Sequence, residues 1–198
     1  ADPLAARGHY ARSKAMAERV ALAADGGPLA VVAVRPHLVW GPGDPQLVER
    51  IIGRARAGRL FLVGSGAALL DTTYLVNAVE AVLAALDRCE QARGQALVVS
   101  NGEPRPVAEM LARICLAAGA PVPRTRVPAR VAWAAGAAVE AAWPLLRRTD
   151  DPPVTRFLAE QLSTAHWFDQ RRTRALLGWR PRVSLEDGLA ELARAYRG

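Results

Sequence analysis

Short apolar runs alternate with longer segments of helical periodicity along the first two thirds of the chain. Continuous runs at residues 29–34, 60–63 and 96–99 each have turn-forming residues at one end. Such runs are typical of strands buried on both faces, as in a parallel sheet. Between them, the spacing of apolar residues predicts helices over 10–24, 46–57 and 106–118, and another that Asp71 or Thr72 caps and that continues to Leu86. In the first of these helices, we expect Met16, Val20 and Leu22 to be available for burial.

The last third of the sequence is predicted to be mainly helical. Ser184, followed three residues later by Asp187, indicates a helix start of the capping-box type. A proline-containing linker over 121–128 precedes helices expected at 129–146, 154–160, 170–177 and 185–196. Strands that alternate with helices, followed by a helical region, predict the α/β class.

Composition excludes some classes of protein but does not identify a function. The 198 residues carry 26 Lys and Arg against 19 Asp and Glu, and 51% are hydrophobic, which excludes a disordered chain. The arginines are scattered along the sequence, so we expect a solvated basic surface and no nucleic acid partner. Cys89 and Cys115 stand far apart in unrelated contexts and are expected to be reduced thiols.

No segment of the sequence predicts a transmembrane span or a metal site. The most apolar stretch, 131–146, contains Glu140 and Pro144 and is shorter than the roughly 20 residues that a spanning helix needs. The first nine residues have no apolar core of the kind found in signal peptides, so we expect a cytoplasmic protein. The histidines are isolated from other metal-ligating residues, and we expect no bound metal: His9, His37 and His166.

Tyr10 and Lys14 carry the clearest candidate chemistry. Four residues apart on a helix, they lie on one face and one turn apart. A fixed ammonium group near a phenol favours the phenolate, so the pair is a candidate general acid/base for interconverting a carbonyl and an alcohol. Lys14 is the only lysine in the chain, which indicates a position where a guanidinium group cannot replace an ammonium group.

Five ordered motifs resemble the extended short-chain dehydrogenase/reductase superfamily and together cover essentially the whole chain. The Tyr-x-x-x-Lys segment precedes Arg-Pro-His-Leu-Val-Trp-Gly-Pro-Gly-Asp at 35–44. Segments similar to the family's Asp-x-x-Tyr helix start, last sheet strand and C-terminal signature follow at 71–79, 97–103 and 177–189. Residues 35–44 and 156–169 look most like the 3β-hydroxysteroid dehydrogenase group, and within it like bacterial reductases of 2-alkyl-3-oxoalkanoates.

This resemblance implies NAD or NADP as cofactor and assigns roles to five residues. Tyr10 would transfer the proton at the substrate oxygen, and Lys14 would tune Tyr10 and bind the nicotinamide ribose. The backbone at Pro36, His37 and Val39 would contact the carboxamide. The family's glycine-rich turn and its upstream serine or threonine are absent, so we expect the C-terminal portion of a longer enzyme that by itself binds the dinucleotide weakly and is inactive.

The same resemblance divides the chain into two regions. Residues 1–45 and 71–102 would complete the Rossmann-type parallel sheet of the NAD(P)-binding domain, and residues 46–70 and 103–198 would form a mostly helical substrate-binding region. The resemblance also leaves open a homodimer and contact with a membrane surface.

The expected substrate is a hydrophobic small molecule. Leu70 precedes Asp71 at the position where nucleotide-sugar enzymes of the superfamily carry a phosphate-binding arginine. Aromatic residues of the last third suit an apolar substrate or an ordinary helical core: Trp133, Trp143, Phe157, Trp167 and Phe168. We therefore expect an NAD(P)(H)-dependent oxidoreductase acting on a 3-hydroxy or 3-oxo group of a steroid or 2-alkyl-3-oxoalkanoate. The alternatives are a nucleotide-sugar epimerase or dehydratase and a non-catalytic cofactor-binding family member.

Overall fold

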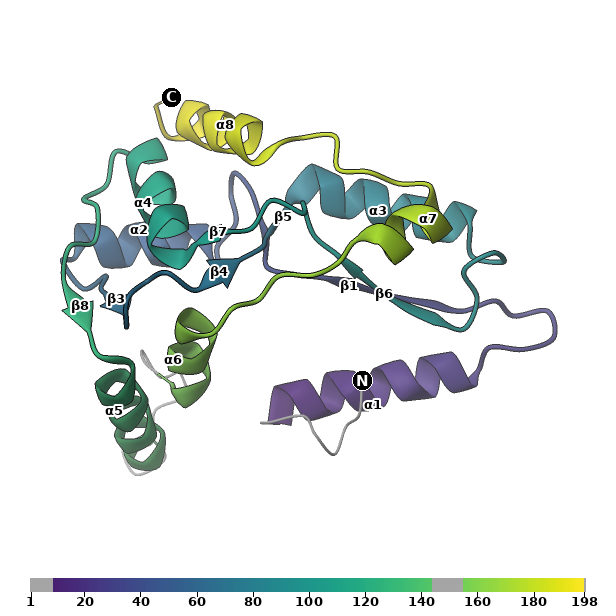
Figure 1. Cartoon of the computed structure of the whole chain (residues 1–198), viewed down its shortest axis with the longest axis horizontal. Helices are drawn as coiled ribbons and strands as arrows, with labels where there is room; N and C mark the ends of the chain where they lie inside the picture. The colour runs from purple at the N-terminus through teal and green to yellow at the C-terminus, as the bar shows by residue number, and fades with distance from the viewer. Residues whose placement is uncertain (1–8, 144–154, 198) are drawn as a thin grey trace.

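The computed structural model describes residues 9–143 and 155–197, which adopt an α/β fold, as the sequence predicts (Figure 1). The elements are α1 (His9–Ala23), β1 (Val32–Pro36), β2 (Val39–Trp40), α2 (Val48–Arg56), β3 (Leu62–Val63), β4 (Leu69–Leu70), β5 (Thr73–Tyr74), α3 (Leu75–Asp87), β6 (Gln95–Val99), β7 (Arg105–Pro106), α4 (Val107–Ala117), β8 (Arg126–Val127), α5 (Ala129–Ala142), α6 (Arg156–Ser163), α7 (Arg171–Leu177) and α8 (Leu185–Arg197).

The longest strands, β1 and β6, pair in parallel, with Val32 opposite Gln95 and Pro36 opposite Val99. Helix α1 lies on one side of this pair, and α3 and α7 lie on the other (Figure 1). Shorter strands extend the pattern: β2 pairs with β5 and β3 with β8 in parallel, while β4 pairs with β7 in the antiparallel sense. The carboxyl ends of β1 and β6 therefore meet at one edge, which is where open parallel sheets place their ligands.

The larger apolar core lies where α2, α4 and α8 pack together around Trp40 and Tyr74. The two rings meet edge to face with centroids 5.2 Å apart, and the Trp40 indole donates a 2.9 Å hydrogen bond to the Thr72 hydroxyl. A Cβ atom at Gly188 would lie only 2.8 Å from the Tyr74 ring. Glycine at this position of α8 therefore allows the helix to approach the two aromatic rings.

Two details of the first βα segment differ from the sequence prediction. The first strand spans 32–36 instead of 29–34, because Leu29 closes a tight turn through paired backbone hydrogen bonds with Gly26. Met16 and Val20 are 60% and 72% exposed, so the expected burial of these side chains is wrong. Helix α1 instead turns Ala15 toward the interior, where that side chain is buried.

Helix α3 also leaves much of its apolar surface in contact with solvent. Its buried residues are Asn77, Ala78, Ala81 and Ala85, whereas Val79, Val82, Leu83 and Leu86 are exposed. Helical periodicity thus identified the helix correctly but did not identify the side that packs.

The helices of the last third lie close to their predicted positions. Helix α5 starts at Ala129 as expected and ends at Ala142, and residues 144–146 of the predicted helix lie outside the described residues. No helix within 9–143 and 155–197 is both long enough and apolar enough to cross a bilayer.

Candidate active site

Tyr10 and Lys14 lie in the first two turns of α1, and both side chains are exposed to solvent. The Lys14 ammonium nitrogen is 5.8 Å from the centroid of the Tyr10 ring, so the structure brings the predicted pair together. Glu18 follows one turn later on the same side of α1. Its carboxylate accepts hydrogen bonds from the Arg35 guanidinium of β1, including one of 2.5 Å from Nε.

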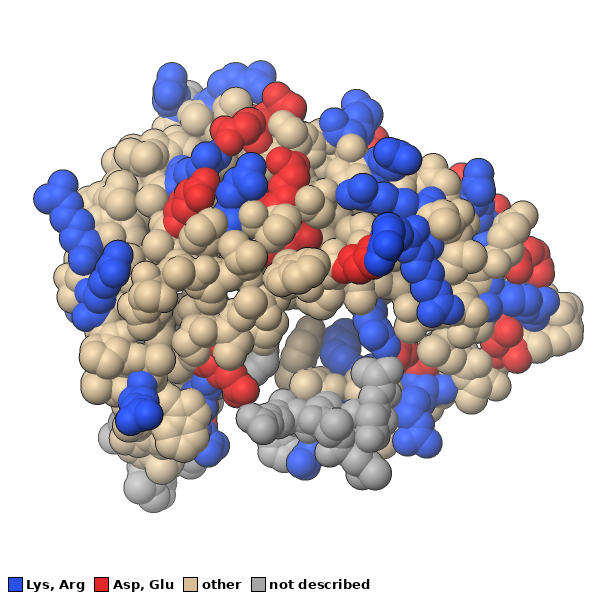
Figure 2. Space-filling model, in the orientation of Figure 1, with Lys and Arg blue, Asp and Glu red and all other residues tan. Residues whose placement is uncertain are grey.

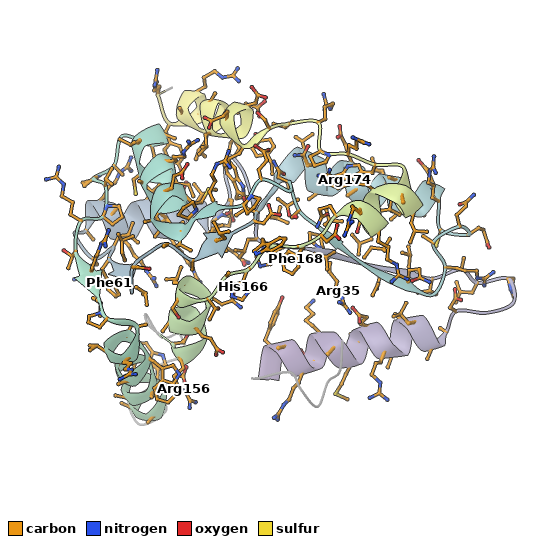
Figure 3. The ribbon with its side chains drawn as sticks, in the orientation of Figure 1. Arg35, Phe61, Arg156, His166, Phe168 and Arg174 are labelled. Atoms are coloured by element: carbon orange, nitrogen blue, oxygen red, sulfur yellow. The ribbon has the colours of Figure 1, made fainter. Side chains whose placement is uncertain are left out.

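The Glu18–Arg35 ion pair fixes which side of α1 faces the sheet. Arg35 points from β1 toward α1, and α1 runs opposite to β1 (Figures 1 and 3). The first turn of α1 therefore lies on the side of the carboxyl end of β1 (Figure 1). Figure 2 shows that the molecule is hollowed between α1 and the elements above it in this view.

This ion pair predicts a specific loss of stability in acid. Hydrogen bonds from Arg35 lower the pKa of Glu18 from 4.5 to about 2. A carboxyl group with a lowered pKa in the folded state contributes stability above its unfolded pKa and loses it as the pH falls toward the folded value. We expect Glu18→Gln to lower the free energy of unfolding by about 1.5–3 kcal/mol at pH 7, and the difference to vanish as the pH falls from about 4.5 to about 2.

Denaturant unfolding at several pH values measures this difference. Glu90→Gln is the matched control, because Glu90 pairs with Arg93 at the surface with its side chain 67% exposed. The control substitution should lower the free energy of unfolding by less than about 1 kcal/mol. Equal losses in the two variants, or a loss for Glu18→Gln that persists near pH 2, would contradict the assignment.

The segment after β1 makes a sharp change of direction at Leu38. Leu38 has φ +44°, the left-handed region that L-residues adopt at a cost of about 1–2 kcal/mol. Its neighbours hold it in place: the His37 amide donates to the Val99 carbonyl at 2.9 Å, and the Thr73 hydroxyl donates to the His37 carbonyl at 2.7 Å. Pro36 and Val39, which the sequence assigned to cofactor contact, are exposed, whereas the backbone amide and carbonyl of His37 are occupied by these internal hydrogen bonds.

The His37 imidazole lies in a small polar and aromatic cluster from distant parts of the chain. Its Nδ1 is 2.5 Å from the Asp71 carbonyl oxygen, and its ring meets Phe168 edge to face at 4.8 Å between centroids. The His166 ring stacks on the His37 ring, with the two centroids 6.0 Å apart. Burial, reinforced by the charge of His37, lowers the pKa of His166. His166 and Phe168 come from the connection between α6 and α7 (Figure 3).

Asp71 is fully buried and joins this cluster to the loop after β6. Its carboxylate accepts hydrogen bonds from the Ser100 hydroxyl at 2.6 Å and from the amides of Gly102 and Glu103 at 3.1 and 3.2 Å. Burial outweighs these bonds and raises the pKa of Asp71. The predicted cap by Asp71 or Thr72 is therefore wrong. Helix α3 begins at Leu75, and the Asn101 side chain accepts from the amide of the preceding Tyr74 at 3.0 Å.

The structure joins some of the residues chosen from the sequence and leaves others apart. Tyr10 and Lys14 lie together on α1, Pro36 ends β1, His37 follows it, and Val39 begins β2. Ion pairing of Glu18 with Arg35 links these two sets of residues. The sequence analysis placed Asp71 and Ser100 in family motifs and considered His166 and Phe168 separately, but it did not predict that these side chains meet around His37 and the loop after β6.

The remaining candidate features give simpler results. Ser65 lies between Gly64 and Gly66, both of which have positive φ, so this segment is a turn. Within the described residues, no group of three or more His, Cys, Asp or Glu side chains could hold a metal ion. On the face shown in Figure 2, Lys and Arg side chains are dispersed among Asp and Glu.

Three described aromatic residues of the last third, Trp133, Trp167 and Phe168, lie in different surroundings. Trp133 and Trp167 are 49% and 58% exposed, and the Arg156 guanidinium lies over the Trp133 ring at 5.8 Å. Phe168 contacts His37 as described above. The side chain of Phe157 lies outside the described residues.

Comparison with known proteins gives a consistent result. Residues 3–128 match the model of the 3-beta hydroxysteroid dehydrogenase/isomerase family. The chain is 47% identical over 186 residues to a 2-alkyl-3-oxoalkanoate reductase of Stenotrophomonas maltophilia, covering 92% of this chain and 56% of the relative. It is 30% identical over 197 residues to the human decarboxylating sterol-4-alpha-carboxylate 3-dehydrogenase, and the match covers 96% of this chain and 53% of the relative.

A solved structure, that of MoeE5 in complex with UDP-glucose and NAD, matches with a TM-score of 0.65 and 25% identity, covering 95% of this chain and 55% of that one. The chain thus spans about half the length of the curated relatives it matches.

Proposed function

The chain belongs to the 3-beta hydroxysteroid dehydrogenase/isomerase family, and from this premise we propose that it supplies the acid/base helix and substrate-binding region of an NAD(P)(H)-dependent oxidoreductase. The reaction is the interconversion of a ketone and a secondary alcohol on a hydrophobic substrate. The name of the Stenotrophomonas relative supports a 2-alkyl-3-oxoalkanoate, and that of the human relative supports a sterol.

The observation that carries the proposal is the placement of Tyr10 and Lys14. They share one side of α1 with Glu18, whose ion pair with Arg35 ties this side to β1. The two exposed side chains are thereby held near the end of β1. An acid/base group must reach the substrate oxygen, and an exposed phenol on a rigid helix meets this requirement.

The residues present also fit the nicotinamide end of a dinucleotide. The Lys14 ammonium is exposed and can donate to ribose hydroxyls, and the exposed residues Pro36 and Val39 lie at the turn that we propose meets the carboxamide. When bound, the cofactor supplies or accepts the hydride at the substrate carbon. Tyr10 donates a proton to the ketone oxygen during reduction and removes it from the alcohol during oxidation.

The main alternative to a hydrophobic substrate is a nucleotide sugar. A kinetic experiment distinguishes these two substrate classes. We expect the complete enzyme to oxidise 2-alkyl-3-hydroxyalkanoates, with kcat/KM rising with alkyl chain length because each buried methylene contributes about 0.8 kcal/mol. The absorbance of the reduced nicotinamide measures the rate. UDP should not compete, since a diphosphate is costly to bury without paired cations. Competition by UDP below about 1 mM, or turnover of a UDP-sugar, would put the nucleotide-sugar function first.

A further inference from the structure

His37 can form hydrogen bonds through its backbone amide, its backbone carbonyl and its two ring nitrogens. The amide donates to the Val99 carbonyl at 2.9 Å, and the carbonyl accepts from the Thr73 hydroxyl at 2.7 Å. Ring nitrogen Nδ1 lies 2.5 Å from the Asp71 carbonyl oxygen. These three groups are therefore engaged within the protein, and the remaining group of His37 is ring nitrogen Nε2.

The contact with Asp71 determines which ring nitrogen carries the proton. A carbonyl oxygen can only accept a hydrogen bond, so Nδ1 must be the donor. In a neutral imidazole the other nitrogen, Nε2, then carries a lone pair and can only accept. The Asp71 backbone is itself held in place, because its amide donates to the His166 carbonyl at 2.8 Å. The fold thus gives His37 a hydrogen-bond acceptor at Nε2.

Nε2 of His37 is available to a ligand. It has no hydrogen-bond partner within residues 9–143 and 155–197. The described side-chain nitrogen and oxygen atoms that are both buried and without a partner belong to Gln170, Arg174 and Trp179, so Nε2 is not closed off from solvent. The His37 side chain as a whole is half-buried.

Neighbouring aromatic side chains restrain the His37 ring. The His166 and Phe168 rings contact it from the connection between α6 and α7 (Figure 3). His166 donates from its own Nε2 to the Thr164 hydroxyl at 2.8 Å, because that hydroxyl gives its proton to the Glu160 carbonyl. A ring that is held on several sides presents Nε2 in a defined direction.

An uncharged acceptor in this place selects a ligand group with an N–H or O–H donor. A carboxylate or a phosphate offers lone pairs, which the lone pair of Nε2 would repel. The turn with His37 follows β1, and the first turns of α1, with Tyr10 and Lys14, lie on the side of the carboxyl end of β1 (Figure 1). At the nicotinamide end of a dinucleotide, the donors are the ribose hydroxyls, which we assign to Lys14, and the NH₂ group of the carboxamide.

We propose that Nε2 of His37 accepts a hydrogen bond from the carboxamide NH₂ group of the nicotinamide and thereby sets the orientation of the carboxamide. This inference rests on the proposed function, which supplies the cofactor. It assigns the contact to the side chain of His37 instead of its backbone, whose amide and carbonyl are engaged with Val99 and Thr73. Because the carboxamide has a donor on one side and an acceptor on the other, a fixed acceptor distinguishes its two orientations.

Binding of cofactor analogues to the complete enzyme tests the proposal. Isothermal titration calorimetry compares the dinucleotide that the enzyme prefers, NAD⁺ or NADP⁺, with its acetylpyridine and thionicotinamide analogues. The acetylpyridine analogue has a methyl group in place of the NH₂ group, whereas the thionicotinamide analogue keeps the NH₂ group. We expect the acetylpyridine analogue to bind about three- to tenfold more weakly than the parent dinucleotide, as the loss of one hydrogen bond predicts, and the thionicotinamide analogue to lose less affinity.

Two substitutions of His37 distinguish a contact with the cofactor from a structural role. Asparagine keeps a nitrogen donor for the Asp71 carbonyl but has no atom at the place of Nε2, whereas glutamine brings an acceptor oxygen to the place of Nε2 and gives up the donor at Nδ1. We expect His37→Asn to weaken binding of the parent dinucleotide by about three- to tenfold and to abolish its preference over the acetylpyridine analogue. His37→Gln should keep part of this preference. A purely structural role predicts the opposite order of the two variants.

His166→Asn is the matched control, because it makes the same change at the neighbouring imidazole, to which we assign no contact with the cofactor. It should leave the preference for the parent dinucleotide within about twofold of that of the unsubstituted enzyme. Thermal unfolding shows whether each variant is folded. If a His37 variant does not fold, the comparison of the analogues on the unsubstituted enzyme decides the outcome.

Specific results would overturn the proposal. One is equal affinity of the unsubstituted enzyme for the parent dinucleotide and its acetylpyridine analogue, and another is a greater loss of affinity in His37→Gln than in His37→Asn. Loss of the preference in His166→Asn alone would transfer the contact to His166. The titrations need neither substrate nor the Tyr10 hydroxyl, so this inference can fail while the proposed hydride transfer stands. If the complete enzyme bound no nicotinamide dinucleotide, both would fail.

Discussion

Replacing Tyr10 with phenylalanine should reduce turnover of the complete enzyme by about 10²–10⁴-fold while leaving nicotinamide cofactor affinity nearly unchanged. The substitution removes only the hydroxyl group that transfers the proton to or from the substrate oxygen. Tyr10 is 74% exposed, so the loss of its hydroxyl disturbs no internal packing. Steady-state kinetics measure the turnover number, and a fluorescence titration with the reduced cofactor measures its affinity.

Tyr196→Phe provides the matched control for this experiment. The Tyr196 hydroxyl donates a hydrogen bond to Glu49, on the other side of the fold from α1, and has no place in the proposed reaction. We expect its removal to leave turnover within about twofold of the parent enzyme. Near-normal turnover of Tyr10→Phe would refute the assignment of Tyr10, and a parallel loss in both variants would reveal a general effect on folding.

The sequence predicted well those features that depend on neighbouring residues. Helices α2, α4, α7 and α8 lie within two residues of their predicted bounds, because helical periodicity is a local property. Ser184 accepts from the Asp187 amide at 3.1 Å, as the capping pattern predicted. The Tyr10–Lys14 pair is another local feature, since spacing along one helix is sufficient to bring the two residues together.

Features that depend on tertiary contacts could not be read from the sequence. The neighbours of His37 come from residues 71, 166 and 168, and only the folded chain brings them together. Asp71 looked like a helix cap because aspartate favours that position. The loop after β6 instead offers its carboxylate two amides and a hydroxyl within hydrogen-bonding distance. The tertiary partners therefore prevail over the local preference.

Burial is the second property that local patterns predicted poorly. An apolar stripe tells which residues can be buried, but a packing partner must be present for burial to occur. Val20 on α1 and Leu86 on α3 are both more than 70% exposed in spite of favourable spacing.

The buried Asp71 carboxylate should make a large contribution to stability. Asp71→Ala leaves the Ser100 hydroxyl and the Gly102 and Glu103 amides without their acceptor, and we expect a loss of about 2–4 kcal/mol in the free energy of unfolding. Asp71→Asn keeps a carbonyl oxygen for the amides and offers an NH₂ group to the Ser100 oxygen. The Asp71→Asn substitution should lower the free energy of unfolding by less than about 1.5 kcal/mol.

The pH dependence of the Asp71→Asn comparison provides an independent check. Burial raises the pKa of Asp71 above its usual value of 3.8, so the folded state favours the protonated carboxyl group. Any stability that this shift contributes is fully present below the unfolded pKa and is lost as the pH rises through the folded value. The parent protein should therefore be at its most stable relative to Asp71→Asn in acid, and this advantage should shrink as the pH rises above about 3.8.

Denaturant unfolding at pH 3 and at pH 7 measures both effects, with Asp87→Ala and Asp87→Asn as exposed controls. The control substitutions should change the free energy of unfolding by no more than about 0.5 kcal/mol. If Asp71→Ala and Asp71→Asn were equally stable, the hydrogen bonds to Ser100 and the loop after β6 would have no energetic importance.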